Sequence, residues 1–334
     1  MKFLDQEIAS LGMGCWPVGG PMFGGEGFGY CGTLGYANAD DDESVRTIHA
    51  ALANGITLFD TAAVYGAGHA ERLLAKALRG RHDALVVTKI GMLIDEETKT
   101  LLGEETDPAA VMPAIDRSLA RLNRDHLDIV LLHLNALPVS KADPIFDAMA
   151  GAIRAGKVRA YGWSTDLVGN VQAVRDRDGF VAVEHASNVL LDAPLMRAEV
   201  ESAGLYALIR SPLGMGLLSG KYDESTQMPA SDIRSTGNTV TAYFRNGRPN
   251  REYVDKINRV RDLLQTGARS LVQGALGWLW AKSERNIPVP GARTVAQIEG
   301  IAGALAHGAL PEAIVSQIDA LIGTSDAASE YRPR

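Results

Sequence analysis

The most constraining feature of this chain is the alternation of short apolar runs, which predict β-strands, with helical patterns from end to end. The predicted strands are Ala9–Trp16, Ile56–Thr61, Ala84–Ile90, Leu127–His133, Arg159–Ser164, Val181–Ser187, Leu205–Arg210 and Asn286–Pro290. The predicted helices are Asp41–Asn54, His69–Leu78, Ala109–Leu122, Pro144–Ala155, Leu167–Arg177, Ala193–Ser202, Leu271–Ser283 and Val295–Ala306. Eight strand-helix alternations without a break in composition favour one α/β domain over residues 1–334, a parallel (β/α)8 barrel, rather than a sandwich or two domains.

The composition of the strands supports a parallel sheet. The runs Ala84–Val87 and Ile129–Leu132 are continuously apolar, as expected of strands that are covered on both faces. Functional sites of such barrels lie at the carboxyl ends of the strands. Five polar residues of this chain occur at or just after strand ends, namely Asp60, Lys89, His133, Ser164 and Arg210.

Two connections are longer than an ordinary turn, and both are expected at the carboxyl face of the barrel. Residues 18–40 are rich in glycine and aromatic side chains, including Phe23, Phe28, Tyr30 and Tyr36, and residues 222–252 form a polar insertion. Loops of that length in a compact domain are usually functional or disordered. The sequence leaves open whether each is an ordered pocket wall or a mobile lid.

The bulk properties exclude several classes of function. The net charge is −7 with both signs interspersed, so no basic stripe favours nucleic acid or an anionic membrane. The amino terminus has no leader pattern and no window reaches about eighteen consecutive apolar residues, so we expect a cytoplasmic protein. Cys15 and Cys31 are too few for a zinc cage, and the histidines have no ligand-like spacing, so no metal is expected.

Two glycine-rich motifs resemble nucleotide-binding loops but fail their requirements. Residues Gly25–Gly29 continue into more glycine-rich loop instead of joining a strand to a helix, as a Rossmann turn must. In Leu213–Lys221 the first glycine of a P-loop would fall on Met215, and Tyr222 stands where Ser or Thr is needed. Neither motif therefore supports a function.

A set of four polar residues carries the chemical signal. Asp60 ends an apolar strand and Tyr65 follows it, while Lys89 and His133 end two later strands. A tyrosine has a pKa near 10, but a neighbouring Lys⁺ favours its ionised form, and a carboxylate can hold that lysine charged and oriented. Each residue alone is more often a turn, cap or core residue, whereas the four together predict a tyrosine tuned for proton transfer.

The pattern Phe-Asp-Thr-Ala…Tyr-Gly…Glu, followed by Thr-Lys and Leu-Leu-His, resembles the aldo-keto reductases, and the resemblance runs along almost the whole chain. It implies that Tyr65 is the general acid/base, that Asp60 and Lys89 tune it, and that His133 orients the substrate carbonyl by donating a hydrogen bond. Trp16 is then expected to shape the substrate pocket.

The late segment Ile287–Gln297 is the candidate for holding the phosphates of a nicotinamide nucleotide. It reads as a strand, a glycine turn and a helix start, so backbone N–H groups at the helix N-terminus would face phosphate oxygens. A plain turn with a surface arginine is the alternative, but the segment is similar to the family's phosphate-binding segment. The residues implied are Gly291, Ala292, Arg293, Thr294 and Gln297, and Arg293 favours NADP(H) over NAD(H).

Three further segments match the family's cofactor cradle, each with a departure. Ser164 and Thr165 stand where the family has Ser-Asn for the carboxamide, and Glu184 stands where Gln is usual. Arg210, Ser211 and Leu213 lie where a stacking Tyr is common, and a planar guanidinium can also stack. The last helix reads Ile298-Glu-Gly300 instead of the family's Glu-Asn toward the adenine.

The function implied is an NAD(P)-dependent aldo-keto reductase that interconverts a small carbonyl compound and its alcohol. A barrel that binds the nucleotide as a regulatory sensor with little turnover is the alternative, and the intact set of Asp60, Tyr65, Lys89 and His133 argues against it. The sequence leaves the substrate, the physiological direction and the oligomeric state open.

Overall fold

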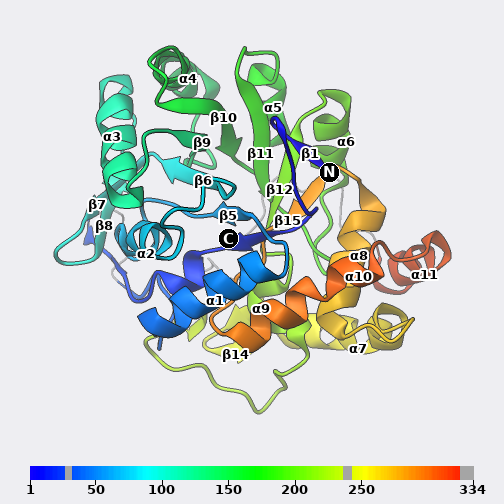
Figure 1. Cartoon of the computed structure of the whole chain (residues 1–334). Helices are drawn as coiled ribbons and strands as arrows, with labels where there is room; N and C mark the ends of the chain where they lie inside the picture. Colours follow the sequence, from blue (N-terminus) through cyan, green and yellow to red (C-terminus); the bar gives the residue numbers. More distant parts are fainter. Residues whose placement is uncertain (27–31, 236–242, 324–334) are drawn as a thin grey trace.

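A computed structural model describes residues 1–26, 32–235 and 243–323. Its centre is a parallel sheet in the order β3-β5-β6-β9-β10-β11-β12-β15 (Figure 1). The strands are β3 Gly12–Gly14, β5 Leu58–Asp60, β6 Leu85–Ile90, β9 Leu127–Leu132, β10 Val158–Ser164, β11 Phe180–Ala186, β12 Tyr206–Arg210 and β15 Asn286–Pro288. Gly14 bridges to Gly291 and its N–H donates to Pro290 O at 3.0 Å, so the sheet nearly closes on itself. The predicted α/β barrel is confirmed, and each predicted strand overlaps one observed strand, although β10 and β11 begin one residue earlier than predicted.

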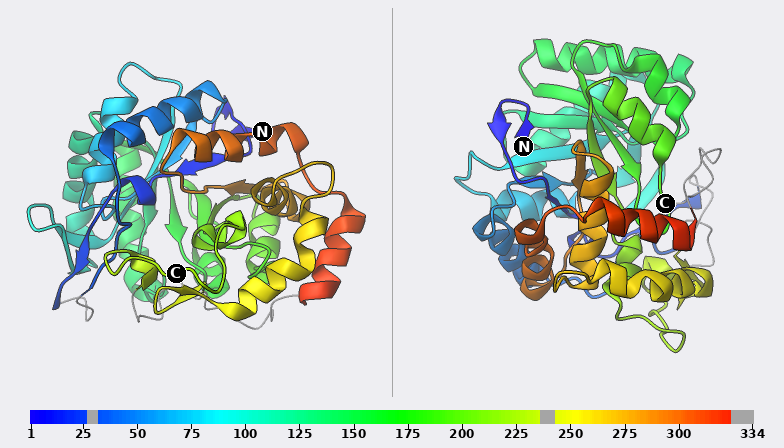
Figure 2. Two further views of the ribbon diagram at one scale, coloured as in Figure 1. Left: turned by 90° about the horizontal axis from the view of Figure 1, so that it is seen from below. Right: turned by 90° about the vertical axis from the view of Figure 1, so that its right-hand side faces the viewer.

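Helices surround the strands on the outside (Figure 2). They are α1 Asp41–Ala53, α2 His69–Ala77, α3 Val111–Leu122, α4 Val139–Arg154, α5 Val168–Val174, α6 Pro194–Ser202, α7 Arg251–Leu264, α8 Leu271–Lys282, α9 Val295–Ala302, α10 Ala304–His307 and α11 Glu312–Ile322. No helix within the described ranges is long and apolar enough to cross a bilayer.

The predicted helices were incomplete in three places. The helix predicted from Pro144 begins at Val139 and keeps Pro144 inside it, so proline was the wrong marker of its start. Helices α7 and α11 were missed. For α7 the start signal was present, because the side chain of Asn250 accepts a hydrogen bond from Glu252 N–H as an N-cap.

Short strands outside the barrel were also missed. Strands β7 Met92–Asp95 and β8 Thr100–Glu104 form an antiparallel hairpin just after β6, and β4 Phe23–Gly24 pairs with β8. The two remaining pairs are β1 Lys2–Phe3 with β2 Gln6–Glu7, and β13 Phe244–Arg245 with β14 Arg248–Pro249. The hairpin matters for function because it anchors part of the long connection 18–40 at the carboxyl face.

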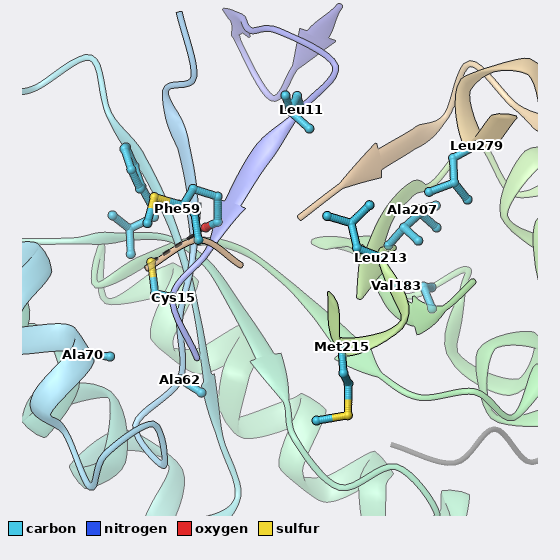
Figure 3. Close-up of a cluster of buried hydrophobic side chains, with 14 of the residues drawn as sticks. Leu11, Cys15, Phe59, Ala62, Ala70, Val183, Ala207, Leu213, Met215 and Leu279 are labelled. Carbon is cyan, nitrogen blue, oxygen red and sulfur yellow. Dashed lines mark hydrogen bonds between the residues drawn. The ribbon is translucent and has the colours of Figure 1, made fainter. Parts of the chain in front are cut away.

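The core has two parts that follow from the two-residue period of the strands. One set of strand residues fills the interior of the barrel with Leu58, Val87, Leu131, Ala182, Leu208 and Ile287. The residues between them face outward and pack against the helices, and Figure 3 shows part of that outer cluster, with Phe59 beside Cys15 and Val183 near Ala207. Phe3 and Ile8 from the region of the β1–β2 hairpin belong to the inner cluster.

Candidate active site

The period of the strands places the predicted polar side chains on the interior face. Asp60, Lys89, His133, Glu184 and Arg210 each follow an interior apolar residue by two positions, so their side chains share its face. Ser164 has the same relation to interior Ala160, four residues earlier. The inward-facing residues that follow the last apolar layer therefore form a polar layer at the carboxyl end of the barrel.

Lys89 is the centre of this layer. Its Nζ donates to Asp60 Oδ1 at 2.6 Å, to Thr61 O at 3.0 Å and to the Tyr65 hydroxyl at 3.3 Å. Glu184 Oε2 lies 3.1 Å from the same nitrogen. The side chain of Lys89 has no exposed surface. Asp60, Tyr65 and Lys89, which were predicted to act together, therefore form a buried cluster. Glu184, which was predicted to contact the nicotinamide, belongs to the same cluster.

Contacts from outside the barrel fix Lys89 in position. The adjacent residue Thr88 faces outward, and its hydroxyl donates to Glu71 Oε1 of α2 at 2.6 Å. The other carboxylate oxygen of Glu71 accepts from Arg121 of α3 at 2.5 Å. This glutamate is the one in the family-like pattern, and its contacts join two helices to the end of β6.

Burial controls the proton affinities of the cluster. Burial lowers the pKa of Lys89, but the charges of Asp60 and Glu184 outweigh it and the net shift is well upward. Burial and the charge of Glu184 raise the pKa of Asp60 well above its usual range, against the opposing effect of Lys89. Burial also raises the pKa of Tyr65, and Lys89 opposes that rise. Lys89 thus acts in the predicted direction, but the phenol of the free protein retains its proton.

Two aromatic neighbours hold the ring of Tyr65. Trp16 stacks on it with ring centroids 5.9 Å apart and an interplanar angle of 18°, and the indole N–H of Trp16 donates to Leu34 O at 3.2 Å. His133 meets the tyrosine ring edge-on at 6.1 Å and 87°. The backbone N–H of His133 donates to Ile90 O at 2.8 Å, so the histidine is placed by the sheet itself.

A cavity of about 510 Å³ connects this cluster with the start of α9. Predicted residues that line it are Trp16, Asp60, Tyr65, His133, Ser164, Glu184, Arg210, Ser211, Leu213, Gly291, Arg293 and Gln297. Lys89 lies beneath the wall, and Thr165, Ala292 and Thr294 do not line the cavity. A cavity of this size with few polar groups among apolar ones is typical of a small-molecule or cofactor site.

The described parts of the two long connections form walls of the cavity. Ile233 N–H donates to Gly35 O at 3.0 Å, which joins the two connections directly. Arg234 pairs with Asp232 at 2.7 and 2.8 Å, donates to the Tyr222 hydroxyl at 2.8 Å and lies 5.3 Å from the ring of Tyr36. Phe28 and Tyr30 and the stretch 236–242 fall outside the described residues.

At the nucleotide end, protein groups already use some of the predicted backbone donors. Arg293 N–H donates to Gln297 Oε1 at 2.8 Å, and Thr294 caps α9 through Gln297 N–H. Val295 N–H donates to Glu43 Oε1 of α1 at 2.9 Å, and Figure 1 shows α1 and α9 side by side. The guanidinium of Arg293 donates one hydrogen to Ala37 O at 2.9 Å, which leaves further N–H groups beside the cavity.

The cradle predicted around the nicotinamide is rearranged in two places. The hydroxyl of Thr165 donates to Asn135 O at 2.7 Å, and Asn135, which sequence reasoning missed, lines the cavity in its neighbourhood. Arg210 forms an ion pair with buried Asp166, whose other oxygen accepts from Ala186 N–H at 2.8 Å. The pairing holds the guanidinium at the cavity wall, and no spacing in the sequence marks Asp166 as its partner.

The residues of the cavity fit a nicotinamide nucleotide. Among the described residues, buried Glu184 Oε2 has no hydrogen-bond donor, and it lies on a residue that lines the cavity. Arg210 offers a planar surface and Arg293 a cation at the far end. No group of three or more His, Cys, Asp or Glu side chains suited to a metal occurs in ranges 1–26, 32–235 and 243–323.

Comparisons with known proteins agree with this geometry. The family model of the aldo/keto reductases matches residues 18–323. Aldo-keto reductase YhdN of Bacillus subtilis (strain 168) is 29% identical over 307 residues, covering 88% of this chain and 84% of that protein. The glycerol dehydrogenase AKR11B4 from Gluconobacter oxydans superposes with a TM-score of 0.78 at 25% identity, covering 99% of this chain and 96% of that structure.

A second solved structure shows the same fold at lower identity. An aldo-keto reductase from Klebsiella pneumoniae in complex with NADPH superposes with a TM-score of 0.67 at 20% identity, covering 98% of this chain and 95% of that one. Since the family model spans nearly the whole barrel, the chain belongs to the aldo/keto reductase family of oxidoreductases.

Proposed function

We propose that this protein is an NADP(H)-dependent oxidoreductase that interconverts an aldehyde or ketone and the corresponding alcohol, with Tyr65 as its proton donor and acceptor. The observation that carries the proposal is the contact of Lys89 Nζ with the Tyr65 hydroxyl at 3.3 Å and with Asp60 at 2.6 Å, at the edge of a cavity large enough for a small-molecule substrate. A bound nicotinamide would supply or accept the hydride at the carbonyl carbon.

The residues of the cluster have distinct roles in the proposal. Tyr65 gives its phenolic proton to the carbonyl oxygen as negative charge develops there. Lys89 stabilises the phenolate left behind, and Asp60 holds Lys89 charged and oriented. His133, whose ring lies beside that of Tyr65, donates a hydrogen bond that orients the carbonyl. In the oxidative direction Tyr65 takes the proton of the alcohol.

Several features support NADP(H) over NAD(H). Arg293 lies at the end of the cavity, with guanidinium N–H groups beyond the one that contacts Ala37. A relative from Schizosaccharomyces pombe is named aldo-keto reductase yakc [NADP(+)], and structures from Klebsiella pneumoniae hold NADPH and NADP. We infer that Arg293 contacts the 2′-phosphate.

The apolar part of the cavity wall indicates the kind of substrate. The side chains of Trp16, Met22, Leu34, Met92 and Leu101 all line this cavity. Apart from the indole N–H, which already contacts Leu34 O, these side chains offer only the weakly accepting thioethers of Met22 and Met92. We therefore expect carbonyl compounds with an apolar substituent to be preferred over strongly charged ones.

The test is turnover with labelled cofactor. NADPH that carries deuterium at its transferable position is incubated with a panel of aldehydes and ketones, and the alcohols are examined by mass spectrometry. The proposal requires steady NADPH consumption and one deuterium at the carbinol carbon. Tight NADPH binding without turnover on any member of a broad panel would favour the nucleotide sensor instead.

A further inference from the structure

Glu184 creates an imbalance of charge and of hydrogen bonds beside Lys89. An ammonium group has three hydrogens, and those of Lys89 are taken by Asp60 Oδ1, Thr61 O and the Tyr65 hydroxyl. Glu184 Oε2 lies 3.1 Å from Nζ, so it feels the charge, yet it has no hydrogen-bond donor among the described residues. The glutamate side chain is 1% exposed, so it has almost no contact with bulk water.

The net charge of the cluster is also unfavourable when both carboxyl groups are ionised. With both carboxyl groups ionised, Asp60, Glu184 and Lys89 sum to −1 inside the barrel, and burial makes that charge expensive. Tyr65 is neutral in the free protein, and so is the buried thiol of Cys15, whose pKa is raised by burial and by the charge of Asp60. His133 and the Arg210–Asp166 ion pair line the same cavity.

We propose that Asp60 and Glu184 share one proton beside Lys89 in the nucleotide-free protein, and that this proton is released when an oxidised nicotinamide binds. The inference rests on the proposed function, because it requires the nicotinamide ring to lie near Glu184. Two neighbouring carboxyl groups in a buried site keep one proton between them, since both cannot ionise together. The raised pKa of Asp60, caused by burial and by Glu184, agrees with this sharing.

The release follows from electrostatics. The oxidised ring carries a positive charge and the reduced ring does not, so only the oxidised form offsets a second carboxylate in the cavity. The proton passes from the shared carboxyl to the buffer, and the vacated oxygen can accept a hydrogen bond from the carboxamide. Affinity for NADP⁺ should therefore rise with pH, by up to about tenfold per pH unit, while affinity for NADPH changes less.

The experiment is isothermal titration calorimetry of the intact protein with NADP⁺ and with NADPH, at neutral pH, in buffers of different ionisation enthalpy. The dependence of the measured heat on the buffer gives the protons released per nucleotide. Both nucleotides carry the same phosphates, so the difference between them reports the nicotinamide end. We expect wild type to release close to one proton more with NADP⁺ than with NADPH.

Three variants locate the source of the proton. Glu184→Gln should abolish the difference between the nucleotides, whereas Tyr65→Phe should keep it. Glu199→Gln is a matched control, because Glu199 of α6 is a buried glutamate that pairs with Arg175. An equal proton count for both nucleotides in wild type, or a difference that survives Glu184→Gln, would overturn the proposal, as would its loss in Tyr65→Phe alone.

A second measurement needs no variant, in case Glu184→Gln does not fold. In wild type, the ratio of the dissociation constant for NADP⁺ to that for NADPH should fall as the pH rises across the neutral range. A ratio that does not change with pH would again contradict shared-proton release. Failure of the proposed function gives a different result, namely no turnover on the carbonyl panel or no saturable nucleotide binding. Failure of shared-proton release leaves turnover and binding intact and removes only the difference in proton count.

Discussion

Lys89→Met should reveal how much of the reaction depends on the buried cation. Lys89 Nζ lies 3.3 Å from the Tyr65 oxygen, and a unit charge at that distance stabilises a phenolate by about 5 kcal/mol at an effective dielectric constant of about 20. That energy equals about a several-thousandfold change in rate, and relaxation around the vacated site reduces it, so we expect alcohol oxidation to slow at least about a hundredfold.

The pH profile distinguishes tuning of Tyr65 from simple damage. Without Lys89 the phenol holds its proton to higher pH. The basic limb of the profile for alcohol oxidation, where the rate rises as Tyr65 ionises, should therefore shift to higher pH. Lys282→Met is a matched control, because Lys282 is a mostly buried lysine that pairs with Asp319 away from the cavity. Removing one partner of a buried ion pair costs about 3–5 kcal/mol of stability, so circular dichroism must show that both variants are folded at the assay temperature. An unmoved basic limb with uniformly reduced turnover would refute the tuning role of Lys89.

Three further predictions concern the nucleotide end and the acid stability of the fold. Arg293→Ala should raise the NADP dissociation constant about tenfold to a hundredfold, the effect of a charge-assisted hydrogen bond, while NAD binding changes little; equal losses for both nucleotides would mean that Arg293 only anchors Ala37. Glu43→Gln removes a negative charge from the N-terminus of α9, so NADP should bind about two- to fivefold more tightly relative to NAD in fluorescence titrations, and an unchanged ratio would place the 2′-phosphate elsewhere. Burial lowers the pKa of His185 from 6.5 to about 4, so the contribution of its neutral form to stability is present above pH 6.5 and is lost as the pH falls toward 4, by about 3 kcal/mol in all. In urea unfolding across that range, the free energy of unfolding should fall less steeply with falling pH for His185→Leu than for wild type. Parallel pH dependences of the two proteins would contradict this.

The sequence predicted the barrel well because the signal repeats. Asp60, Lys89 and His133 each follow an apolar strand residue in the same register, so they were recognisable before any contact was known, whereas Tyr65 lies in the turn after β5. The hairpin β7–β8 was missed because its apolar runs, Met92–Ile94 and Leu101–Leu102, are shorter than those of the barrel strands, and of its strand residues only Leu101 is buried. Helix α7 was missed although Asn250 caps it.

The details that the sequence left out are contacts between distant residues. Glu43 reaches Val295 across 252 positions, and Asp166 holds Arg210 from 44 positions away. Glu184 was placed at the nicotinamide by similarity, and its distance of 3.1 Å to Lys89 follows from the narrow interior of the barrel, where side chains of β6 and β11 meet. The spacing of these residues along the chain does not predict their contacts.

The central claim, that Tyr65 transfers the proton, is tested most directly by separating binding from chemistry in Tyr65→Phe. Tyr206→Phe is the control, because Tyr206 packs against Phe3 among the residues of the inner core and does not line the cavity. We predict that Tyr65→Phe binds NADPH within a few-fold of wild type, while its single-turnover rate of carbonyl reduction falls by about a hundredfold or more. A single-turnover rate above about a tenth of the wild-type value would show that another group is the acid.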